Sequence, residues 1–390
     1  MDIAASKICV IGGGIGGLAV ANAFARRGAS VTVLEQSEAI KEVGAGLQIS
    51  PNGMRVLEAL GLADNLRNCS IKADAVSLRD YREGSVVVRL DLTQLPEGQD
   101  YQFVHRADLV EVLAAGARDA GVNIRLLQQV VDIDMEAGVV TTSSGDSVQA
   151  DLIVGADGLH SVLREKILGK RAPFFTGQVA WRAVIPNDLH FPAEARVYMG
   201  LGKHLVCYPL RDGSLLNLVA VQERSEWAAE GWHFKDDPKN LEEAFAEFGP
   251  EVHALFERVE DVGLWGLYRH KVAPKWFKGK TALLGDAAHP TLPFMAQGAN
   301  MALEDAWVLA DTFETEATLP KALQAYQKKR RSRCEKIVET ASGNAWKYHL
   351  SSLPLRWVAH LGMKIIGDLA PGRLLHQFDW IYGHDVTKRP

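Results

Sequence analysis

The chain has 390 residues, of which 47% are hydrophobic and 23% are charged, a composition typical of a globular protein large enough for two domains. The formal net charge of −5 and the lack of a basic cluster interleaved with aromatic residues argue against nucleic-acid binding. The sequence contains neither an uninterrupted apolar run of about 18 residues nor a signal-peptide pattern, which predicts a cytoplasmic protein with no membrane span.

The N-terminal segment combines an apolar strand, a glycine-rich turn and a helix. Residues 8–11 form the strand, the turn has the sequence Gly12-Gly13-Gly14-Ile15-Gly16-Gly17, and a second strand is expected over 30–34. Gly12, Gly14 and Gly17 match the dinucleotide-binding fingerprint, and Glu35 follows at the spacing of the acid that binds a ribose hydroxyl. The alternative is a glycine-rich turn without a ligand, but the order of strand, helix, strand and acid favours a nucleotide with a free 2′-hydroxyl.

The middle of the chain changes to short strands. An apolar strand over 148–154 runs into Gly155-Ala156-Asp157-Gly158, where the carboxyl end of a strand meets a helix that begins near Val162, a usual ligand position. Residues 238–256 are expected to form one helix that crosses back. An antiparallel sheet, the expected second domain, is predicted from alternating or aromatic-rich segments at 75–92, 176–184, 196–198, 204–210 and 215–222.

The segment from Leu284 to Asn300 is expected to form a strand, a proline-rich loop and a helix. The strand ends at Gly285-Asp286, and apolar residues at helical spacing after Gly298 predict a helix with free N–H groups near Gln297, Ala299 and Asn300. Such a helix end favours an anionic ligand. Taken alone, the segment is also compatible with a plain strand-to-helix turn.

The remaining polar features predict little chemistry. The four cysteines form no CxxC pair, and His289 lacks the converging ligands of a zinc site, so neither a disulfide framework nor a metal is expected. The basic run 328–333 is expected on a solvated helix face, with nucleotide or partner attraction as the alternative. Residues 346–390 are expected to pack as terminal helices. Because residues 363–366 could instead mark a dimer contact, both a monomer and a homodimer are compatible with the sequence.

Taken in order, the glycine turn with Glu35, the Asp157-Gly158 segment and the Gly285-Asp286 segment resemble the single-component FAD-dependent aromatic hydroxylases, or class A flavoprotein monooxygenases. Residues 43–52 and 105–109 are similar to the branch of salicylate hydroxylase and 3-hydroxybenzoate 6-hydroxylase. The resemblance covers about residues 6–345. The expected fold is α/β, with a Rossmann-type FAD-binding domain and its parallel sheet assembled from residues 1–73, 98–172 and 276–345, an antiparallel-sheet substrate domain from 74–97 and 173–275, and a C-terminal helical segment over 346–390.

The resemblance implies a role for each motif in binding FAD. The glycine turn would hold the pyrophosphate, Glu35 the adenosine ribose and Asp286 the ribityl chain, while residues 297–300 would face the flavin pyrimidine edge. Two positions depart from the pattern: Lys41 stands where relatives often carry Arg and loses the bidentate fork, and Ala296 replaces a Gly. The expected FAD-binding residues are Gly12, Gly14, Ile15, Gly16, Gly17, Glu35, Gln36, Lys41, Arg106, Asp157, Gly158, Gly285, Asp286, Pro293, Gln297, Gly298, Ala299 and Asn300, and Asp157-Gly158 is shared with the nicotinamide nucleotide.

The leading hypothesis is hydroxylation of an activated aromatic ring, such as a hydroxybenzoate, salicylate or hydroxypyridine. In this cycle NADH or NADPH binds transiently and reduces FAD, O2 adds to flavin C4a, and the hydroperoxide transfers one oxygen atom to the ring. His204 is the better general base on chemical grounds, with Tyr208 as the other catalytic candidate. A surface turn would equally explain His204, and plain packing Tyr208. Pro293 would border the oxygen-transfer position, and the candidate substrate residues are Gln48, Arg182, Phe294 and Met295, with a structural salt bridge as the alternative for Arg182.

Two other functions are compatible with these motifs. One is a flavoprotein that oxidises or epoxidises a non-aromatic or polycyclic metabolite, because a fold does not determine a substrate. The other is a non-catalytic carrier of flavin or a prenyl ligand. The intact Gly285-Asp286 pair and the loop through Gly298 favour catalysis, since a carrier needs no open flavin face.

Overall fold

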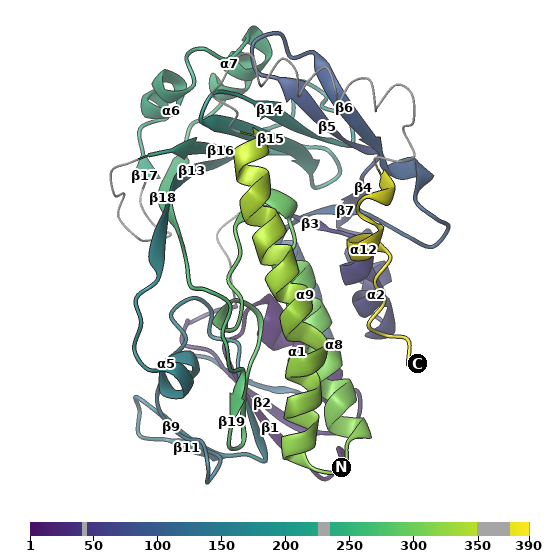
Figure 1. Ribbon diagram of the computed structural model, residues 1–390, viewed down its shortest axis with the longest axis vertical. Helices are drawn as coiled ribbons and strands as arrows, with labels where there is room; N and C mark the ends of the chain where they lie inside the picture. The colour runs from purple at the N-terminus through teal and green to yellow at the C-terminus, as the bar shows by residue number, and fades with distance from the viewer. Residues whose placement is uncertain (41–44, 225–234, 349–374, 390) are drawn as a thin grey trace.

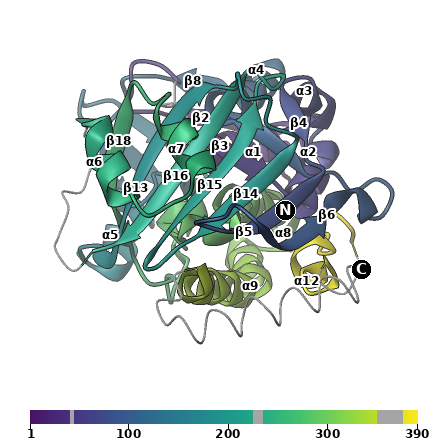
Figure 2. The ribbon, with the colours of Figure 1, turned by 90° about the horizontal axis from the view of Figure 1, so that it is seen from above.

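The computed structural model describes residues 1–40, 45–224, 235–348 and 375–389, with the backbone alone for 344–348. Two large sheets lie at opposite ends of the long axis, and the helix α9 (Leu319–Tyr348) runs along the molecule between them (Figure 1). Seen from above, the upper sheet covers the N-terminal elements (Figure 2). Among the described residues, no helix combines the length and the apolar character needed to cross a membrane.

The lower sheet has six strands in the order β19-β20-β12-β1-β2-β8. All neighbours are parallel except the short edge pair β19 and β20. The central strands are apolar and buried, as expected for a parallel sheet covered on both faces. The strands are β1 (Lys7–Ile11), β2 (Ser30–Leu34), β8 (Asn123–Arg125), β12 (Leu152–Gly155), β19 (Phe277–Lys278) and β20 (Thr281–Leu283).

Helices cover one face of this sheet and a small second sheet covers the other. Helix α1 (Ile15–Ala25) packs against α4 (Arg106–Asp119) and α8 (Gly298–Thr315), and its many small side chains permit the close approach. On the other side lie α5 (Val162–Leu168) and the strands β9 (Val130–Asp134), β10 (Val139–Thr142) and β11 (Ser147–Gln149).

The single strand expected over 148–154 is wrong, because the chain changes sheets inside it. Strand β11 pairs with β10, whereas β12 pairs with β1. Between them, the Asp151 carboxylate accepts a hydrogen bond from the Lys7 backbone N–H at 2.8 Å. This bond holds the break at the amino end of β1.

The upper sheet has eight strands in the order β17-β18-β13-β16-β15-β14-β5-β6. Its strands are antiparallel apart from β14 and β5, which run parallel, so the expected antiparallel sheet is slightly mixed. The hairpin expected over 75–92 is confirmed as β5 and β6. The bounds are β5 (Ala75–Asp80), β6 (Val86–Asp91), β13 (Phe174–Pro186), β14 (Glu194–Met199), β15 (Lys203–Leu210), β16 (Leu215–Glu223), β17 (Lys235–Asp236) and β18 (Val262–Arg269).

One face of the upper sheet packs on two helices where the sequence predicted one. Helix α6 (Pro238–Ala244) and helix α7 (Pro250–Phe256) are separated at Gly249, whose N–H donates to the Tyr81 carbonyl at 2.7 Å. Pro250 then starts the second helix, since proline fits the first helical position and not a helix interior. The prediction of a continuous helix was wrong for this reason.

A three-stranded sheet and the C-terminal helix α12 (Asp379–Tyr382) lie between the two large sheets (Figure 1). Strands β3 (Gly46–Ile49), β4 (Ser70–Lys72) and β7 (Gln102–His105) form the order β3-β7-β4, next to α2 (Pro51–Ala59) and α3 (Ala63–Arg67). Helix α12 lies beside α2 (Figure 1). Three single-turn helices complete the described elements: η1 (Leu92–Gln94), η2 (Gly285–Ala287) and η3 (Pro293–Met295).

Candidate functional site

The three motif-bearing segments meet at one edge of the parallel sheet. Ile11 lies beside Leu34 and Gly155 in the strand register, and Gly155 lies beside Leu283. The strands therefore end level with one another. The loops that follow are tied together by backbone bonds: Gly12 N–H to Leu34 O at 2.9 Å, Ala156 N–H to Ile11 O at 2.8 Å, and Leu284 N–H to Gly155 O at 3.0 Å.

The first loop depends on glycine at two positions. Gly12 has φ +101°, and a Cβ atom there would lie 2.5 Å from the Ala156 carbonyl oxygen. A Cβ atom on Gly17 would lie 1.9 Å from the Gly12 carbonyl oxygen. No side chain caps the N-terminus of α1, so its first N–H groups remain available to an anion such as a pyrophosphate.

Glu35 is held at the end of β2 beside this loop. Its carboxylate accepts hydrogen bonds from the Gly13 N–H at 2.6 Å and the Ser37 N–H at 2.8 Å. A carboxylate offers about four acceptor positions, so two remain for ligand hydroxyl groups. Gln36 is exposed next to it.

Arg106 and Asp286 bring opposite charges to the same region. Burial lowers the pKa of Arg106, and the Asp286 carboxylate opposes that shift. Asp286 lies in η2 and is accessible to water. Desolvation by the surrounding protein raises the pKa of its carboxyl group, whereas the positive charges of His289 and Arg106 lower it. The pair can thus bind a ligand that carries both phosphate and hydroxyl groups.

One carboxylate oxygen of Asp157 accepts no hydrogen bond from the described residues. Its Oδ2 atom accepts from the Val162 N–H at 2.8 Å, whereas the buried Oδ1 atom has no hydrogen-bond partner there. Burial raises the pKa of this carboxyl group. Buried polar atoms are rarely left unbonded, so Asp157 is suited to a ligand donor.

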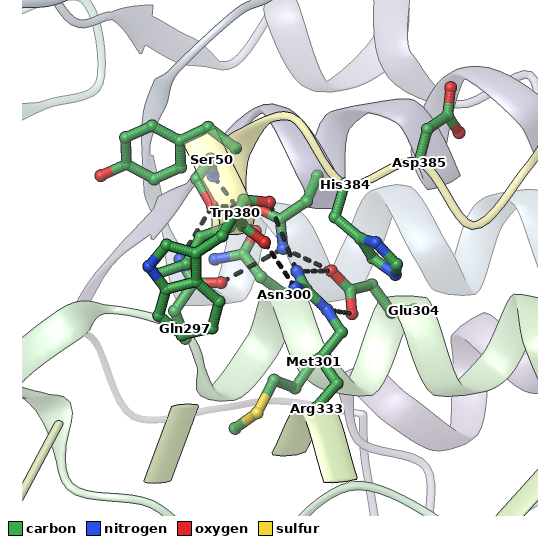
Figure 3. A network of polar contacts seen from close by, with 12 residues as sticks. Ser50, Gln297, Asn300, Met301, Glu304, Arg333, Trp380, His384 and Asp385 are labelled. Atoms are coloured by element: carbon green, nitrogen blue, oxygen red, sulfur yellow. Dashed lines mark hydrogen bonds and ion pairs between the residues drawn. The ribbon is translucent and has the colours of Figure 1, made fainter. Parts of the chain in front are cut away.

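The loop before α8 is held by a buried polar network (Figure 3). Gln297 donates from Nε2 to Ser50 Oγ at 2.9 Å, and Asn52 donates from Nδ2 to Gln297 Oε1 at 3.2 Å. Asn300 donates from Nδ2 to Ala296 O at 2.7 Å and to Gln48 O at 3.0 Å. These hydrogen bonds occupy the side chains of Gln297 and Asn300. The N-terminal N–H groups of α8 therefore have no side-chain cap.

Ala296 adopts the left-handed conformation with φ +51°. Such a conformation costs a non-glycine residue energy and persists only where neighbours enforce it. The hydrogen bond from Asn300 to the Ala296 carbonyl provides that constraint.

A buried cluster of charges lies behind the loop. Arg330 donates to Asp305 Oδ1 at 2.7 Å and to Glu304 Oε2 at 2.5 Å, and Arg333 donates to both Glu304 oxygens at 2.9 and 2.8 Å. Burial opposes ionisation of Glu304, but the two arginines outweigh it and lower its pKa to about 2. The expected solvated face over 328–333 was wrong for these two arginines, since Arg330 is fully buried and Arg333 half-buried.

The surroundings of His289 also differ from those that the sequence predicted. His289, Asp305 and Cys334 have potential ligand atoms within 4.8 Å of one another, so ligands do converge here. However, Arg330 bonds to Asp305 and approaches Cys334 Sγ at 3.6 Å. His289 Nε2 and Asp305 Oδ2 are 2.5 Å apart, and although desolvation acts against the charged ring, Cys334 and Asp305 raise the His289 pKa above its usual value. The cluster is therefore arranged as a charge network around a guanidinium group.

The inner face of the upper sheet points toward η3. His204 is buried, which removes the surface-turn explanation, and its ring lies 5.3 Å from that of Phe294 at 63°. Phe294 packs with Ala180, Val221 and other apolar side chains. Arg182 lies over the Trp265 ring at 4.6 Å.

Tyr208 lies further along the same face, beside Gln48. The two side chains hydrogen bond, and Tyr101 donates from its hydroxyl to Gln48 Oε1 at 2.7 Å. Burial raises the pKa of Tyr208, although Arg182 and Gln48 act to lower it. Tyr208 is consequently neutral near pH 7 and suited to hydrogen bonding. Met295 packs against the apolar cluster that contains Tyr208.

The structure thus gathers the predicted residues into two groups, one along the sheet edge and one on the inner face of the upper sheet. Lys41 lies outside the described residues. Sequence reasoning missed Ser50, Asn52, Glu304, Asp305 and Arg330. The one available signal was the adjacent acidic pair Glu304-Asp305 inside an otherwise apolar helix.

Together, a parallel sheet with a dinucleotide-binding turn and a second sheet facing a helix N-terminus define a nucleotide-cofactor oxidoreductase. The chain belongs to the FAD binding domain family, whose model matches residues 5–341. The glycine turn, the Glu35 carboxylate and the charged Arg106–Asp286 pair are chemically suited to this cofactor.

Curated relatives extend the similarity over nearly the whole chain. A 3-amino-4-hydroxybenzoate 2-monooxygenase of Streptomyces platensis is 32% identical, with 98% of this chain and 96% of the relative covered. A 3-hydroxybenzoate 6-hydroxylase of Polaromonas naphthalenivorans is 33% identical, with 97% and 96% covered. The solved structure of Klebsiella pneumoniae HpxO with FAD and uric acid has a TM-score of 0.83 at 26% identity, with 95% of each chain covered.

These findings confirm the predicted family, fold class, FAD cofactor and enzyme class. The chain is an FAD-dependent monooxygenase.

Proposed function

We propose that this monooxygenase hydroxylates an aromatic ring that carries a phenolic hydroxyl group and a carboxylate, with O2 as co-substrate and NADH or NADPH as electron donor. The observation that supports this proposal best is the position of Arg182 on the inner sheet face, over the Trp265 ring at 4.6 Å. Burial and the nearby Arg106 lower the pKa of this guanidinium group. A desolvated guanidinium favours an anion, and it binds carboxylates in a bidentate geometry. The two aromatic relatives named above act, by their names, on rings with both groups.

We assign separate roles to the residues of the inner face. Bound FAD supplies the oxygen activation and transfer. His204 accepts the phenolic proton, neutral Tyr208 holds the ring oxygen by a hydrogen bond, and Arg182 binds the carboxylate. Phe294 forms the apolar wall that excludes water, and Gln48 and Met295 complete the site with Pro293.

The cofactor side of the proposal uses the sheet edge. The α1 N-terminus would bind the pyrophosphate, Glu35 the adenosine ribose and Asp286 the ribityl chain, with Arg106 beside them. The uncapped N-terminus of α8 would stabilise negative charge on the flavin pyrimidine edge. Asp157 remains a proposed contact for either nucleotide. The FAD-binding part would comprise 1–73, 98–172 and 276–345.

The test is a substrate panel assayed with wild-type protein and Arg182→Met. Hydroxybenzoates, aminohydroxybenzoates and hydroxypyridine carboxylates are each paired with the decarboxylated ring, and product heavier by one oxygen is followed with NADH and NADPH consumption. We expect Arg182→Met to raise KM about 100-fold for the carboxylated member, since a charge-assisted bidentate contact contributes about 3 kcal/mol. KM for the decarboxylated member should change less than threefold.

Uric acid belongs in the same panel, because the HpxO structure holds that compound. Turnover of uric acid or another non-benzenoid ring, with no turnover of any hydroxybenzoate, would replace the proposal by the alternative of a different heterocycle or polycyclic substrate.

The acid–base assignment predicts unequal effects for His204→Phe and Tyr208→Phe. Loss of the base should lower kcat by about 100-fold or more, whereas loss of one hydrogen bond should cost about tenfold. Neither change should weaken FAD binding more than twofold, because the sheet edge is untouched. Stopped-flow oxidation and FAD titration measure the two quantities, and unchanged turnover in both variants would move ring activation to other residues.

A further inference from the structure

The chain end returns to the proposed substrate side of the molecule. Leu375, Ile381 and Tyr382 are buried in one apolar cluster with Tyr208 and Tyr101. In Figure 1 the yellow helix α12 lies beside α2 and near strands β3 and β7, which come from the N-terminal third of the chain. The described C-terminal segment, residues 375–389, is therefore next to residues that are far away in sequence.

Aromatic packing gives the first connection from this segment to the site. The Tyr382 ring packs edge-on against the Tyr101 ring, with centroids 5.8 Å apart and an angle of 81°. Tyr101 in turn donates to Gln48 Oε1 at 2.7 Å, and Gln48 hydrogen bonds with Tyr208. The side chain of Gln48 is held between two tyrosines, and one of them rests on the C-terminal segment.

Arg333 gives the second connection, through the buried network. Its guanidinium donates to the Trp380 carbonyl at 2.8 Å and the Ile381 carbonyl at 3.3 Å, while also holding Glu304. Glu304 Oε1 accepts a hydrogen bond from Asn52 Nδ2 at 2.7 Å. The network continues through Gln297 and Ser50 to Asn300, which donates to the Gln48 carbonyl.

Arg55 on α2 adds a further anchor. It donates to the His384 carbonyl at 3.1 Å and to the Tyr382 carbonyl, and it lies 3.8 Å from the Asp385 carboxylate. The C-terminal backbone is thus bound by two arginines from different helices. Such bonding fixes the position of the Tyr382 ring against Tyr101.

We infer that residues 375–385 are a positioning element that sets the orientation of the Gln48 side chain, and through it Tyr208, for the substrate ring. This inference rests on the proposed function for its effect on turnover. Gln48 is reached from the segment both by its side chain and by its backbone, so a loosened segment would leave the amide free to rotate. Substrate would then bind in several poses, and reducing equivalents would be lost as hydrogen peroxide.

The experiment compares Tyr382→Ala and Tyr101→Phe with the control Gln377→Ala, all as FAD-loaded full-length chains. Tyr101→Phe keeps the ring and removes the hydroxyl group that donates to Gln48. Gln377 lies in the same segment, but its side chain is exposed, so its truncation leaves the packing of Tyr382 in place. We expect KM for the preferred ring to rise about five- to tenfold in the first two variants and peroxide release per NAD(P)H to at least double, with kcat and FAD affinity within twofold.

Hydrogen–deuterium exchange provides a readout that needs no substrate. Amides of a peptide covering residues 46–52 should exchange at least threefold faster in Tyr382→Ala and Tyr101→Phe than in wild type. Their exchange rate should be unchanged in Gln377→Ala. The inference would be overturned if Tyr382→Ala and Tyr101→Phe both showed the hydrogen exchange, the KM and the peroxide release of the wild type. If wild-type protein hydroxylates no panel compound, the proposed function fails, and the exchange comparison still decides the positioning role.

Discussion

Replacing Gly17 with alanine should give a colourless protein that no longer retains FAD. The new Cβ atom would lie 1.9 Å from the Gly12 carbonyl oxygen, a separation that real atoms do not adopt, so the turn must open. The obstacle is backbone and cannot rotate away, unlike a flexible side chain. We expect FAD affinity to fall at least 100-fold, about 2.7 kcal/mol, measured by the flavin absorbance of purified protein and by titration with FAD.

Gly343→Ala is the matched control for this substitution. A Cβ atom on Gly343 in α9 meets no atom within 4 Å among the described residues, and alanine favours a helix interior by about 1 kcal/mol. This variant should keep stoichiometric FAD and unfold at the same or a slightly higher temperature. Circular dichroism separates loss of the turn from loss of the fold. A folded Gly17→Ala protein with wild-type FAD affinity would contradict the role of the turn.

Arg330→Met should strongly destabilise the FAD-loaded protein near neutral pH. The substitution removes the cation shared by Asp305 and Glu304, both fully buried, and leaves them only His289 and Arg333 as charged partners. Breaking a buried ion pair costs about 3–5 kcal/mol. Equilibrium unfolding in urea, followed by tryptophan fluorescence at several pH values, measures the change in unfolding free energy.

The pH dependence of this effect has a defined sign. In the wild type the Glu304 pKa of about 2 lies below the ordinary value of 4.5, so Glu304 contributes stability above about pH 4.5 and loses it as the pH falls toward 2. Without Arg330 the carboxylate gains less from being charged. The difference between wild type and variant should therefore be largest at neutral pH and shrink in acid.

Arg331→Met is the control on the same helix. Arg331 is more exposed and donates to Glu335 one turn away at 2.9 Å, an interaction of a kind that contributes less than about 1 kcal/mol. Equal losses from Arg330→Met and Arg331→Met would contradict the assignment of the buried network as the main stabilising charge cluster.

Local rules were sufficient for the cofactor loops. The glycine turn could be predicted because a strand, a tight turn and a helix follow each other directly, and only glycine fits the approach of Gly12 to Ala156. The helix from Gly298 could likewise be predicted from the spacing of its apolar residues, and it is confirmed as α8. The charge run at 328–333 was misjudged because the faces of α9 are decided by the acids of α8 that lie against it.

The fold class, the dinucleotide-binding turn and the FAD-dependent class of enzyme could be predicted from the amino-acid sequence, since these depend on short segments whose glycines, acids and apolar periods act within a few residues. The burial of His204, the place of Gln48 between Tyr101 and Tyr208, and the packing of the chain end beside them became visible only in the folded protein. The physical reason is that side-chain burial and pairing between distant segments follow from how the two sheets and α9 pack. Neighbouring residues in sequence do not encode such contacts.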